Sequence, residues 1–167
     1  MDTLIAFVLS FLVTVFGGAP AQTDVDQGVH ETATAEVVRV IDGDTIEVRI
    51  NNEVVKVRYI GIDTPEPYQE EEPECYSTEA SQRNTELVAE QVVTLVSDVE
   101  DTDRYGRLLR YVYVGEKMIN QILIEEGYAT KLQIPPNTRY ASEFQAAEAT
   151  ARNNGFGLWS VCKAVSS

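Results

Sequence analysis

Three short runs of β-branched and apolar residues follow one another in this chain, with only three residues between one run and the next. The runs cover residues 35–41, 45–50 and 54–60. In the second run apolar and polar side chains alternate, which is the period of a half-buried β-strand. Asp42-Gly43 and Asn51-Asn52 stand at the two breaks, and residues of these types accept the positive φ angles of tight hairpin turns. Antiparallel strands joined this closely favour a small β-barrel.

The rest of the chain adds two predicted strands and three predicted helices. Residues 92–99 and 108–114 are rich in β-branched and aromatic side chains, which indicates strands. The helices are expected from Ser77 or Thr78 to Glu90, from Lys117 or Met118 to Gly127, and from a cap at Asn137-Thr138 to Gly155. We therefore predict an α+β fold with a five-stranded barrel and three helices, in one domain that covers residues 35–167.

Two acidic residues fall at the ends of neighbouring predicted strands. Asp44 follows the first turn, and Asp63 follows the third strand. Two carboxylates on one rim would repel each other unless a divalent cation lay between them, and calcium accepts carboxylate and carbonyl oxygens in a flexible geometry. The only histidine is His30 and the only cysteines are Cys75 and Cys162, so a zinc site is not expected.

Two arginines complete a set suited to phosphate chemistry. Arg58 lies in the third predicted strand and Arg107 follows a Tyr-Gly turn; a guanidinium donates two parallel hydrogen bonds to phosphate oxygens. Each fragment alone has an ordinary explanation, because Asp42-Gly43 suits a simple turn, Pro65 ends a strand, and either arginine could be a solvated surface charge. Together they are typical of a phosphodiesterase.

The order and spacing of six segments carry a family resemblance. They are Asp42-Gly43-Asp44-Thr45, Arg58, Asp63-Thr64-Pro65-Glu66, Asp103-Arg104-Tyr105-Gly106-Arg107, Gly127-Tyr128-Ala129 and Gly157-Leu158-Trp159-Ser160. With them the chain resembles the staphylococcal nuclease-like thermonuclease family over about residues 35–160. The resemblance implies a calcium-dependent nuclease acting on DNA or RNA, on a five-stranded OB-fold-type β-barrel with three α-helices.

The resemblance also implies a calcium site. Asp44 and Asp63 would bind Ca2+ through their carboxylates and Thr64 through its backbone carbonyl. Asp42 would lie behind these ligands and contact them rather than the ion. A hard cation with oxygen ligands is consistent with the residue types alone.

The same resemblance assigns the catalytic roles. Glu66 would be the general base that activates the attacking water, and the nearby calcium and arginine charges would keep it ionised by lowering its pKa. Arg58 and Arg107 would stabilise the phosphate in the transition state, and Tyr105 would contact the substrate. Residues 130–137 lack the tyrosines that the family has near its nucleotide-binding face. A non-catalytic nucleic-acid or protein binding module on the same fold is therefore the alternative, as is a calcium-binding domain without hydrolysis.

The N-terminal segment indicates export. The apolar run at residues 4–16 is followed by Gly17-Gly18-Ala19-Pro20-Ala21, which fits the small-residue rule for signal cleavage before Gln22. We predict that residues 1–21 are a signal peptide; because the start lacks Lys and Arg, an uncleaved N-terminal membrane anchor is the alternative. The polar residues 22–34 are expected to be a flexible linker. Either route gives a secreted protein or one displayed at the cell surface.

The cysteine and charge content add two expectations. Two cysteines in an exported domain favour a disulfide between Cys75 and Cys162, with two free thiols as the alternative. The chain has 27 acidic against 13 basic residues, a net charge of −14, which should repel a polyanion at low salt. The site could be locally positive, the protein could be halophilic and work in high salt, or it could bind no nucleic acid. Nothing indicates an obligate protein partner, and a monomer is expected.

Overall fold

The computed structural model describes residues 31–67 and 72–162. The predicted signal peptide or anchor, residues 1–21, lies outside the described residues, and so does most of the predicted linker. The first strand, β1, covers Thr32–Val40 and is paired from its first residue, since Thr32 lies opposite Val96. Residues 32–34, which were predicted as the end of the linker, therefore belong to the fold.

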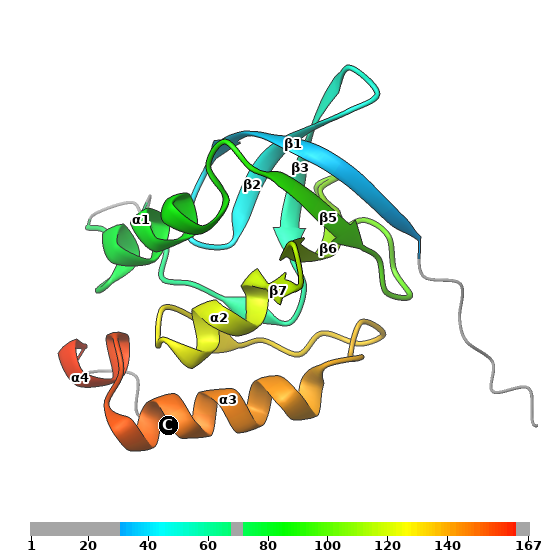
Figure 1. The fold of residues 1–167 in the computed structure, drawn as a ribbon. Coiled ribbons are helices and arrows are strands. Elements are labelled where there is room, and N and C mark those ends of the chain that lie inside the picture. Colours follow the sequence, from blue (N-terminus) through cyan, green and yellow to red (C-terminus); the bar gives the residue numbers. More distant parts are fainter. Residues whose placement is uncertain (1–30, 68–71, 163–167) are drawn as a thin grey trace, which may run out of the picture.

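The predicted five-stranded barrel is confirmed. Its strands are β1, β2 (Thr45–Ile50), β3 (Glu53–Tyr59), β5 (Val92–Val96) and β6 (Leu108–Val114). The antiparallel order β3-β2-β1-β5-β6 is closed by a parallel pairing of β3 with β6, in which Val57 lies opposite Leu108. The curled sheet is visible in Figure 1. The barrel leaves no open edge among these five strands and brings the end of β3 beside the start of β6.

The two hairpin turns differ from each other. Asn51 and Asn52 have positive φ angles of 50° and 70°, as the sequence predicts. The first turn lacks this feature, since neither Asp42 nor Gly43 has a positive φ angle. Gly43 is needed for a different reason: a Cβ atom there would lie 2.6 Å from Oγ1 of Thr64. The first turn therefore packs directly against the segment that follows β3.

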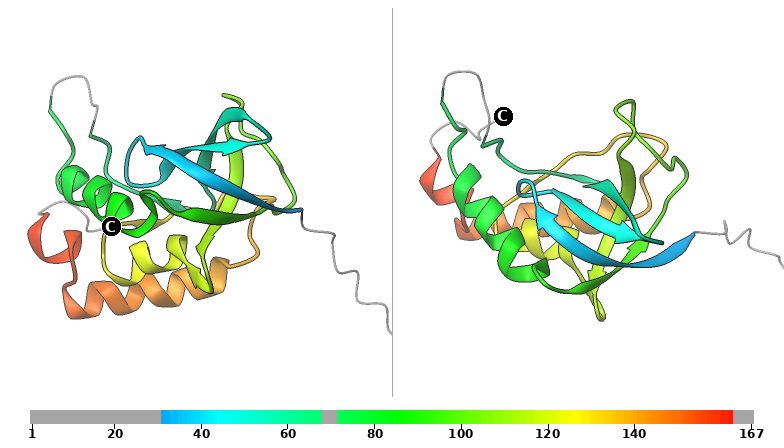
Figure 2. Two further views of the ribbon diagram at one scale, coloured as in Figure 1. Left: turned by 45° about the horizontal axis from the view of Figure 1, so that its top comes forward. Right: turned by 90° about the horizontal axis from the view of Figure 1, so that it is seen from above.

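Helices cover one end of the barrel. They are α1 (Ser77–Val88), α2 (Ile119–Glu125), α3 (Ala141–Asn154) and the short α4 (Leu158–Val161), so the described chain has one helix more than predicted. Figure 2 shows α2 and α3 side by side beneath the barrel, with α4 near α1. Two-residue strands complete the fold: β4 (Ile62–Asp63), β7 (Lys117–Met118) and β8 (Thr130–Lys131).

Asn137 does not cap α3, contrary to the prediction. The helix begins at Ala141, and the buried amide of Asn137 bonds instead to the backbone of Glu100. Its Oδ1 accepts from the Glu100 N–H at 2.7 Å, and its Nδ2 donates to the Glu100 carbonyl at 3.0 Å. Asn137 therefore anchors the loop between β5 and β6.

The core joins the barrel interior to the inner faces of α2 and α3. Its fully buried members include Ile46, Val48, Val57, Leu95, Val112, Leu123, Ile124 and Phe144. Cys75 and Cys162 form a disulfide with 5.9 Å between their Cα atoms, as predicted. No helix in the described parts of the chain combines the length and the hydropathy that a membrane span requires.

Candidate active site

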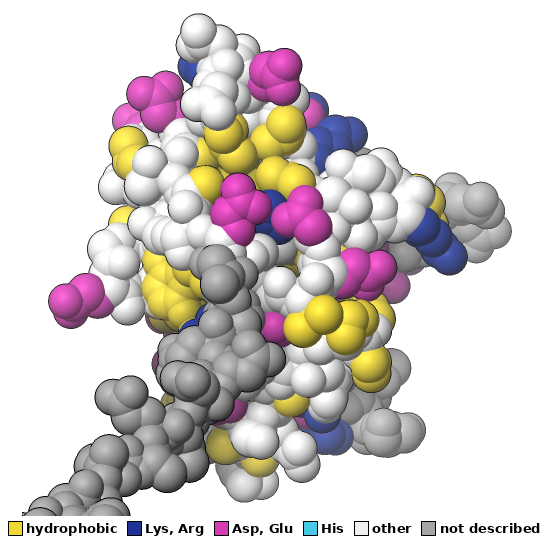
Figure 3. All heavy atoms as spheres, turned by 90° about the vertical axis from the view of Figure 1, so that its right-hand side faces the viewer, with side chains coloured by type: hydrophobic (Ala, Val, Ile, Leu, Met, Phe, Trp, Pro, Cys, Tyr) yellow, Lys and Arg dark blue, Asp and Glu magenta, His cyan; other side chains and the backbone are white. Residues whose placement is uncertain are grey.

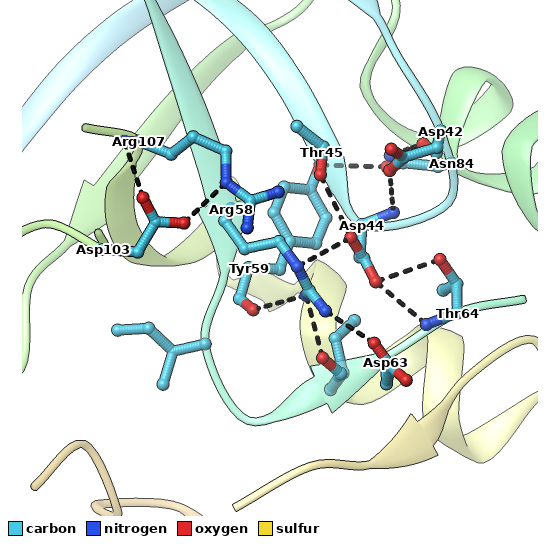
Figure 4. A network of polar contacts seen from close by, with 12 residues as sticks. Asp42, Asp44, Thr45, Arg58, Tyr59, Asp63, Thr64, Asn84, Asp103 and Arg107 are labelled. Atoms are coloured by element: carbon cyan, nitrogen blue, oxygen red, sulfur yellow. Dashed lines mark hydrogen bonds and ion pairs between the residues drawn. The ribbon is translucent and has the colours of Figure 1, made fainter. Parts of the chain in front are cut away.

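Asp44 is the centre of the polar network drawn in Figure 4. It immediately precedes β2 and is fully buried. Its Oδ2 accepts hydrogen bonds from the N–H of Thr64 at 2.9 Å and from Oγ1 of Thr64 at 3.0 Å, while its Oδ1 accepts from Oγ1 of Thr45 at 3.1 Å. Burial raises the pKa of Asp44 to about 7, although the Arg58 guanidinium opposes the rise. The fold therefore holds a carboxylate where ionisation is unfavourable without added positive charge.

Arg58 joins the two predicted calcium ligands. It lies near the end of β3, and its Nε is 3.1 Å from Oδ1 of Asp44, while Nη2 donates to Oδ1 of Asp63 at 2.8 Å. Its Nη1 donates to the carbonyls of Tyr59 at 3.0 Å and Ile62 at 2.8 Å. The side chain is only 11% exposed, so its position is fixed by the bend between β3 and β4.

Asp42 lies behind Asp44 in the first turn. Its Oδ1 accepts the backbone N–H of Asp44 at 3.0 Å, and its carbonyl accepts Nδ2 of Asn84 at 2.9 Å. Asn84 is fully buried in α1, and its Oδ1 accepts the hydroxyl of Tyr59 at 2.9 Å. The sequence analysis missed Asn84. The available signal was its spacing four residues from both Ala80 and Val88, which places a polar side chain on the buried face of the helix.

The donor atoms fit a hard cation. Asp44 of the first turn, together with Asp63 and Thr64 of the segment after β3, supplies two carboxylates and a peptide carbonyl. All are oxygen ligands of the kind calcium takes. No cluster of three or more His, Cys, Asp or Glu side chains arranged to hold a metal occurs in residues 31–67 and 72–162. A third protein ligand would therefore be the Thr64 carbonyl, which agrees with the ligand set implied by the resemblance.

Glu66 follows this bend and is partly exposed. Burial and the negative charge of Asp42 raise its pKa, and Arg58 only partly offsets them. Burial and the neighbouring carboxylates thus outweigh Arg58 in the calcium-free protein, and a lowering of the Glu66 pKa by calcium and arginine together stays a prediction. Its backbone N–H donates to Oε2 of Glu74 at 2.9 Å; Glu74 was not among the predicted site residues.

Arg107 is oriented by Asp103, to which the sequence analysis assigned no role of its own. Oδ2 of Asp103 binds Nε of Arg107 at 2.6 Å, and Oδ1 accepts the N–H groups of Arg107 at 3.0 Å and Tyr105 at 2.9 Å. Gly106 supplies the positive φ of 78° that this turn requires. The terminal nitrogens of Arg107 have no hydrogen-bond partner within the described part of the chain, and the guanidinium lies 5.6 Å from the ring centroid of Tyr105. The side chain reaches toward Arg58 in Figure 4.

One cavity connects the two arginines. It has a volume of about 490 Å³, and both arginines line it together with Tyr105 and the apolar side chains of Leu132 and Ile134. Tyr105 is 68% exposed, with the guanidinium of Arg104 4.7 Å from its ring centroid. The structure thus brings together Asp42 and Asp44 of the first turn, Arg58 at the end of β3, and Asp63, Thr64 and Glu66 of the segment that follows. Tyr105 and Arg107 lie on the same cavity as Arg58.

The surface around the site carries mixed charge. On the face drawn in Figure 3, acidic side chains are scattered among basic and apolar ones. Several arginines are paired with carboxylates, including Arg39 with Glu47 and Arg110 with Asp101. Part of the basic charge on the described chain outside the cavity is therefore paired with carboxylates.

Comparison with known proteins agrees with the site. The sequence model described as "Staphylococcal nuclease homologue" matches residues 56–161. The chain is 42% identical over 125 residues to the SPbeta prophage-derived endonuclease YokF of Bacillus subtilis, covering 73% of this chain and 42% of that protein. It is 41% identical over 125 residues to the endonuclease YncB of the same organism, covering 73% and 59%. To the thermonuclease of Staphylococcus hyicus it is 38% identical over 128 residues, covering 76% of each.

The OB-type barrel and the site lined by arginines and carboxylates define the class of protein, and the sequence matches agree with it. The chain belongs to the staphylococcal nuclease homologue family. It spans only about half the length of the two Bacillus relatives.

Proposed function

We propose that this protein is a nuclease that hydrolyses phosphodiester bonds of DNA or RNA with calcium as its cofactor. The observation that carries the proposal is the contact of Arg58 with both Asp44 and Asp63, beside a cavity that Arg107 also lines. The relatives named above, two endonucleases and a thermonuclease, support the same activity.

The residues that would hold the cofactor are Asp44, Asp63 and the carbonyl of Thr64. When bound there, calcium supplies positive charge against the phosphate oxygens. The ion would also favour ionised Asp44, whose pKa is about 7 in the protein alone, because metal ligands bind in their deprotonated form.

The two arginines have different starting positions. Nε, Nη1 and Nη2 of Arg58 each contact a protein oxygen. A phosphate would therefore have to share or displace one of these contacts. Arg107 is held through Nε by Asp103, and its terminal nitrogens are available to bind two phosphate oxygens. We assign Arg107 to the charge that develops in the transition state and Arg58 to orientation of the phosphate near the carboxylates.

Glu66 is the proposed general base. It must accept a proton from water in line with the leaving oxygen, and a positioned base contributes roughly a hundred- to ten-thousand-fold to the rate. Its partial exposure leaves room for that water. Tyr105, which is exposed at the cavity mouth, is proposed to contact the substrate beside the scissile phosphate.

The test of this function is hydrolysis of single-stranded DNA by the full-length chain, with calcium and with a chelator. Glu66→Gln is compared with the wild type, since the amide keeps the shape of the side chain but cannot accept the proton. The proposal predicts calcium-dependent cleavage that the variant loses while it still folds and binds calcium. A folded wild type that binds single-stranded DNA without cleaving it would identify a binding module instead.

We further propose that the protein is exported and that its acidity is an adaptation to high salt. The Cys75–Cys162 disulfide supports export, because such bonds persist in oxidising surroundings. At molar salt the Debye length is ~3 Å, so long-range repulsion of a polyanion nearly vanishes. Activity that rises toward high salt is expected, and a steady fall from low to multimolar salt would argue against the halophilic proposal.

A further inference from the structure

Glu66 and Glu74 are joined by a reciprocal pair of hydrogen bonds. The Glu66 N–H donates to Oε2 of Glu74 at 2.9 Å, and the Glu74 N–H donates to the Glu66 carbonyl at 3.0 Å. Within residues 31–67 and 72–162, these are the hydrogen bonds that Glu66 makes. The backbone of the proposed general base is thus fixed through one residue, which lies eight positions further along the chain.

Glu74 is itself held by its neighbours in sequence. Its carbonyl accepts the N–H of Ser77, the first residue of α1, at 3.0 Å. Cys75 is bonded to Cys162, 87 residues away, directly after α4. The ring of Tyr76 stacks on that of Tyr128, with 5.4 Å between centroids. Three contacts therefore tie this segment to the helical side of the domain.

The Cys75–Cys162 disulfide lines a cavity that Asp63 and Thr64 also line. A cavity of about 320 Å³ is lined by Asp63 and Thr64 on one side and by Glu74, Cys75 and Cys162 on the other. Leu158 of α4 also lines it and is buried, and its N–H bonds to the Gly127 carbonyl at 2.9 Å. The cysteine pair thus connects the segment to a part of the fold that is itself well anchored.

The calcium ligands do not depend on this tie. Asp44 and Thr64 bind each other directly, and Asp63 lies in β4, which pairs with β8. Arg58 bridges the two carboxylates from β3. Loss of the link between the Glu74 segment and the helices would therefore release the backbone of Glu66 but leave the proposed calcium ligands in place.

We propose that Glu74 is a positioning residue for Glu66 and that the Cys75–Cys162 disulfide keeps it in place, so that turnover requires the oxidised protein. The inference rests on the proposed nuclease function. A dithiol reductant would supply two electrons, and its two protons would pass to the sulfurs as the S–S bond breaks, giving the thiols of Cys75 and Cys162 and an oxidised reductant. The segment that carries Glu74 would then lose its link to α4.

The first test compares Glu74→Ala with Glu74→Gln in the oxidised full-length chain. Alanine removes the acceptor for the Glu66 N–H, whereas the glutamine amide oxygen retains it. Relative to Glu74→Gln, Glu74→Ala should lower kcat about three- to tenfold, the effect of losing one hydrogen bond. The two variants should have the same KM and calcium affinity, since both remove the Glu74 charge that acts on Asp63. Glu74→Gln should restore most of kcat. Glu72→Ala, at an exposed position in the same loop, is the matched control and should equal the wild type.

The second test compares oxidised and dithiothreitol-treated wild type with the double variant Cys75→Ser, Cys162→Ser. Reduction should lower kcat without changing calcium affinity, and the double variant should have the low kcat and no response to reductant. Near-ultraviolet circular dichroism checks that each protein is folded. If the double variant does not fold, the Glu74 variants decide, because they keep the disulfide.

Three results would overturn the proposal. They are an unchanged kcat in Glu74→Ala, a Glu74→Gln variant as slow as Glu74→Ala, and a calcium affinity that is lower in Glu74→Ala than in Glu74→Gln, which would indicate a general structural role. A wild type with no turnover at all would refute the nuclease function itself, whereas an active wild type that is indifferent to reduction and to Glu74→Ala would refute only the positioning role.

Discussion

Replacing Asn84 by alanine should be among the more destabilising single changes in this domain. Its side chain is fully buried and connects two parts of the site, donating to the Asp42 carbonyl and accepting from the Tyr59 hydroxyl, both at 2.9 Å. Asn84→Ala would leave both partners without a hydrogen bond in a region closed to water. Each stranded group costs about 1 to 3 kcal/mol, so we expect a loss of about 2 to 6 kcal/mol in the free energy of unfolding.

The assay is urea unfolding of the full-length chain, followed by circular dichroism. Gln82→Ala is the matched control, because Gln82 lies in the same helix but is exposed, and its effect should stay within about 0.5 kcal/mol. In a Tyr59→Phe background the hydroxyl is already absent, so Asn84→Ala should cost about 1 to 3 kcal/mol less. An Asn84→Ala effect no larger than that of Gln82→Ala, or strict additivity with Tyr59→Phe, would refute this account of the buried network.

Three further predictions concern the bend and its ion. Gly43→Ala should weaken calcium binding, measured by calorimetry, and lower the melting temperature, because the new Cβ would lie 2.6 Å from Oγ1 of Thr64. Asp103→Asn should lower kcat more than it raises KM in DNA hydrolysis, since it weakens the charge-assisted bond that orients Arg107. Burial raises the pKa of Asp44 to about 7, so the folded state keeps a proton there that the unfolded chain loses near pH 4. The stability of the calcium-free protein should therefore fall as pH rises between about 4 and 7, and calcium affinity should increase over the same range.

Each of these predictions has a contrary outcome. Unaltered calcium affinity in Gly43→Ala would mean that the turn can move away from Thr64 without disturbing Asp44. A kcat for Asp103→Asn equal to that of the wild type would show that Arg107 orients itself without its partner. Calcium affinity independent of pH between 5 and 8 would show that Asp44 is ionised throughout; the melting curves of calcium-free protein over that range provide the control.

The barrel could be predicted because its strands carry local signals. Alternation, asparagine turns and β-branched runs mark the strands in the sequence, and the Asn51-Asn52 turn has the predicted backbone angles. The parallel closure between β3 and β6 has no such local signal, since Val57 and Leu108 are far apart in the chain. The start of α3 was misplaced because Asn137 is a good capping residue by type, while its actual partner is the distant backbone of Glu100.

The candidate site likewise contains residues that the sequence predicts and residues that only the structure reveals. Residue types and family resemblance selected Asp44, Arg58 and Asp63, and the fold brings them into contact. The residues that hold others in place, such as Asn84 and Glu74, were missed because their importance depends on partners that only the folded chain supplies. Gly43 was assigned to a positive φ, but the close approach of Thr64 is a tertiary constraint that no turn rule contains.

The central claim is that the carboxylates of Asp44 and Asp63 bind the calcium that supports turnover. The most direct test titrates calcium into wild type and Asp44→Asn, measuring bound calcium by calorimetry and hydrolysis of single-stranded DNA in parallel, with melting curves to confirm folding. The account predicts one midpoint for binding and turnover in the wild type and the loss of both in Asp44→Asn. Hydrolysis by the wild type that persists in excess chelator, or calcium-dependent hydrolysis by a folded Asp44→Asn variant at the wild-type midpoint, would contradict it.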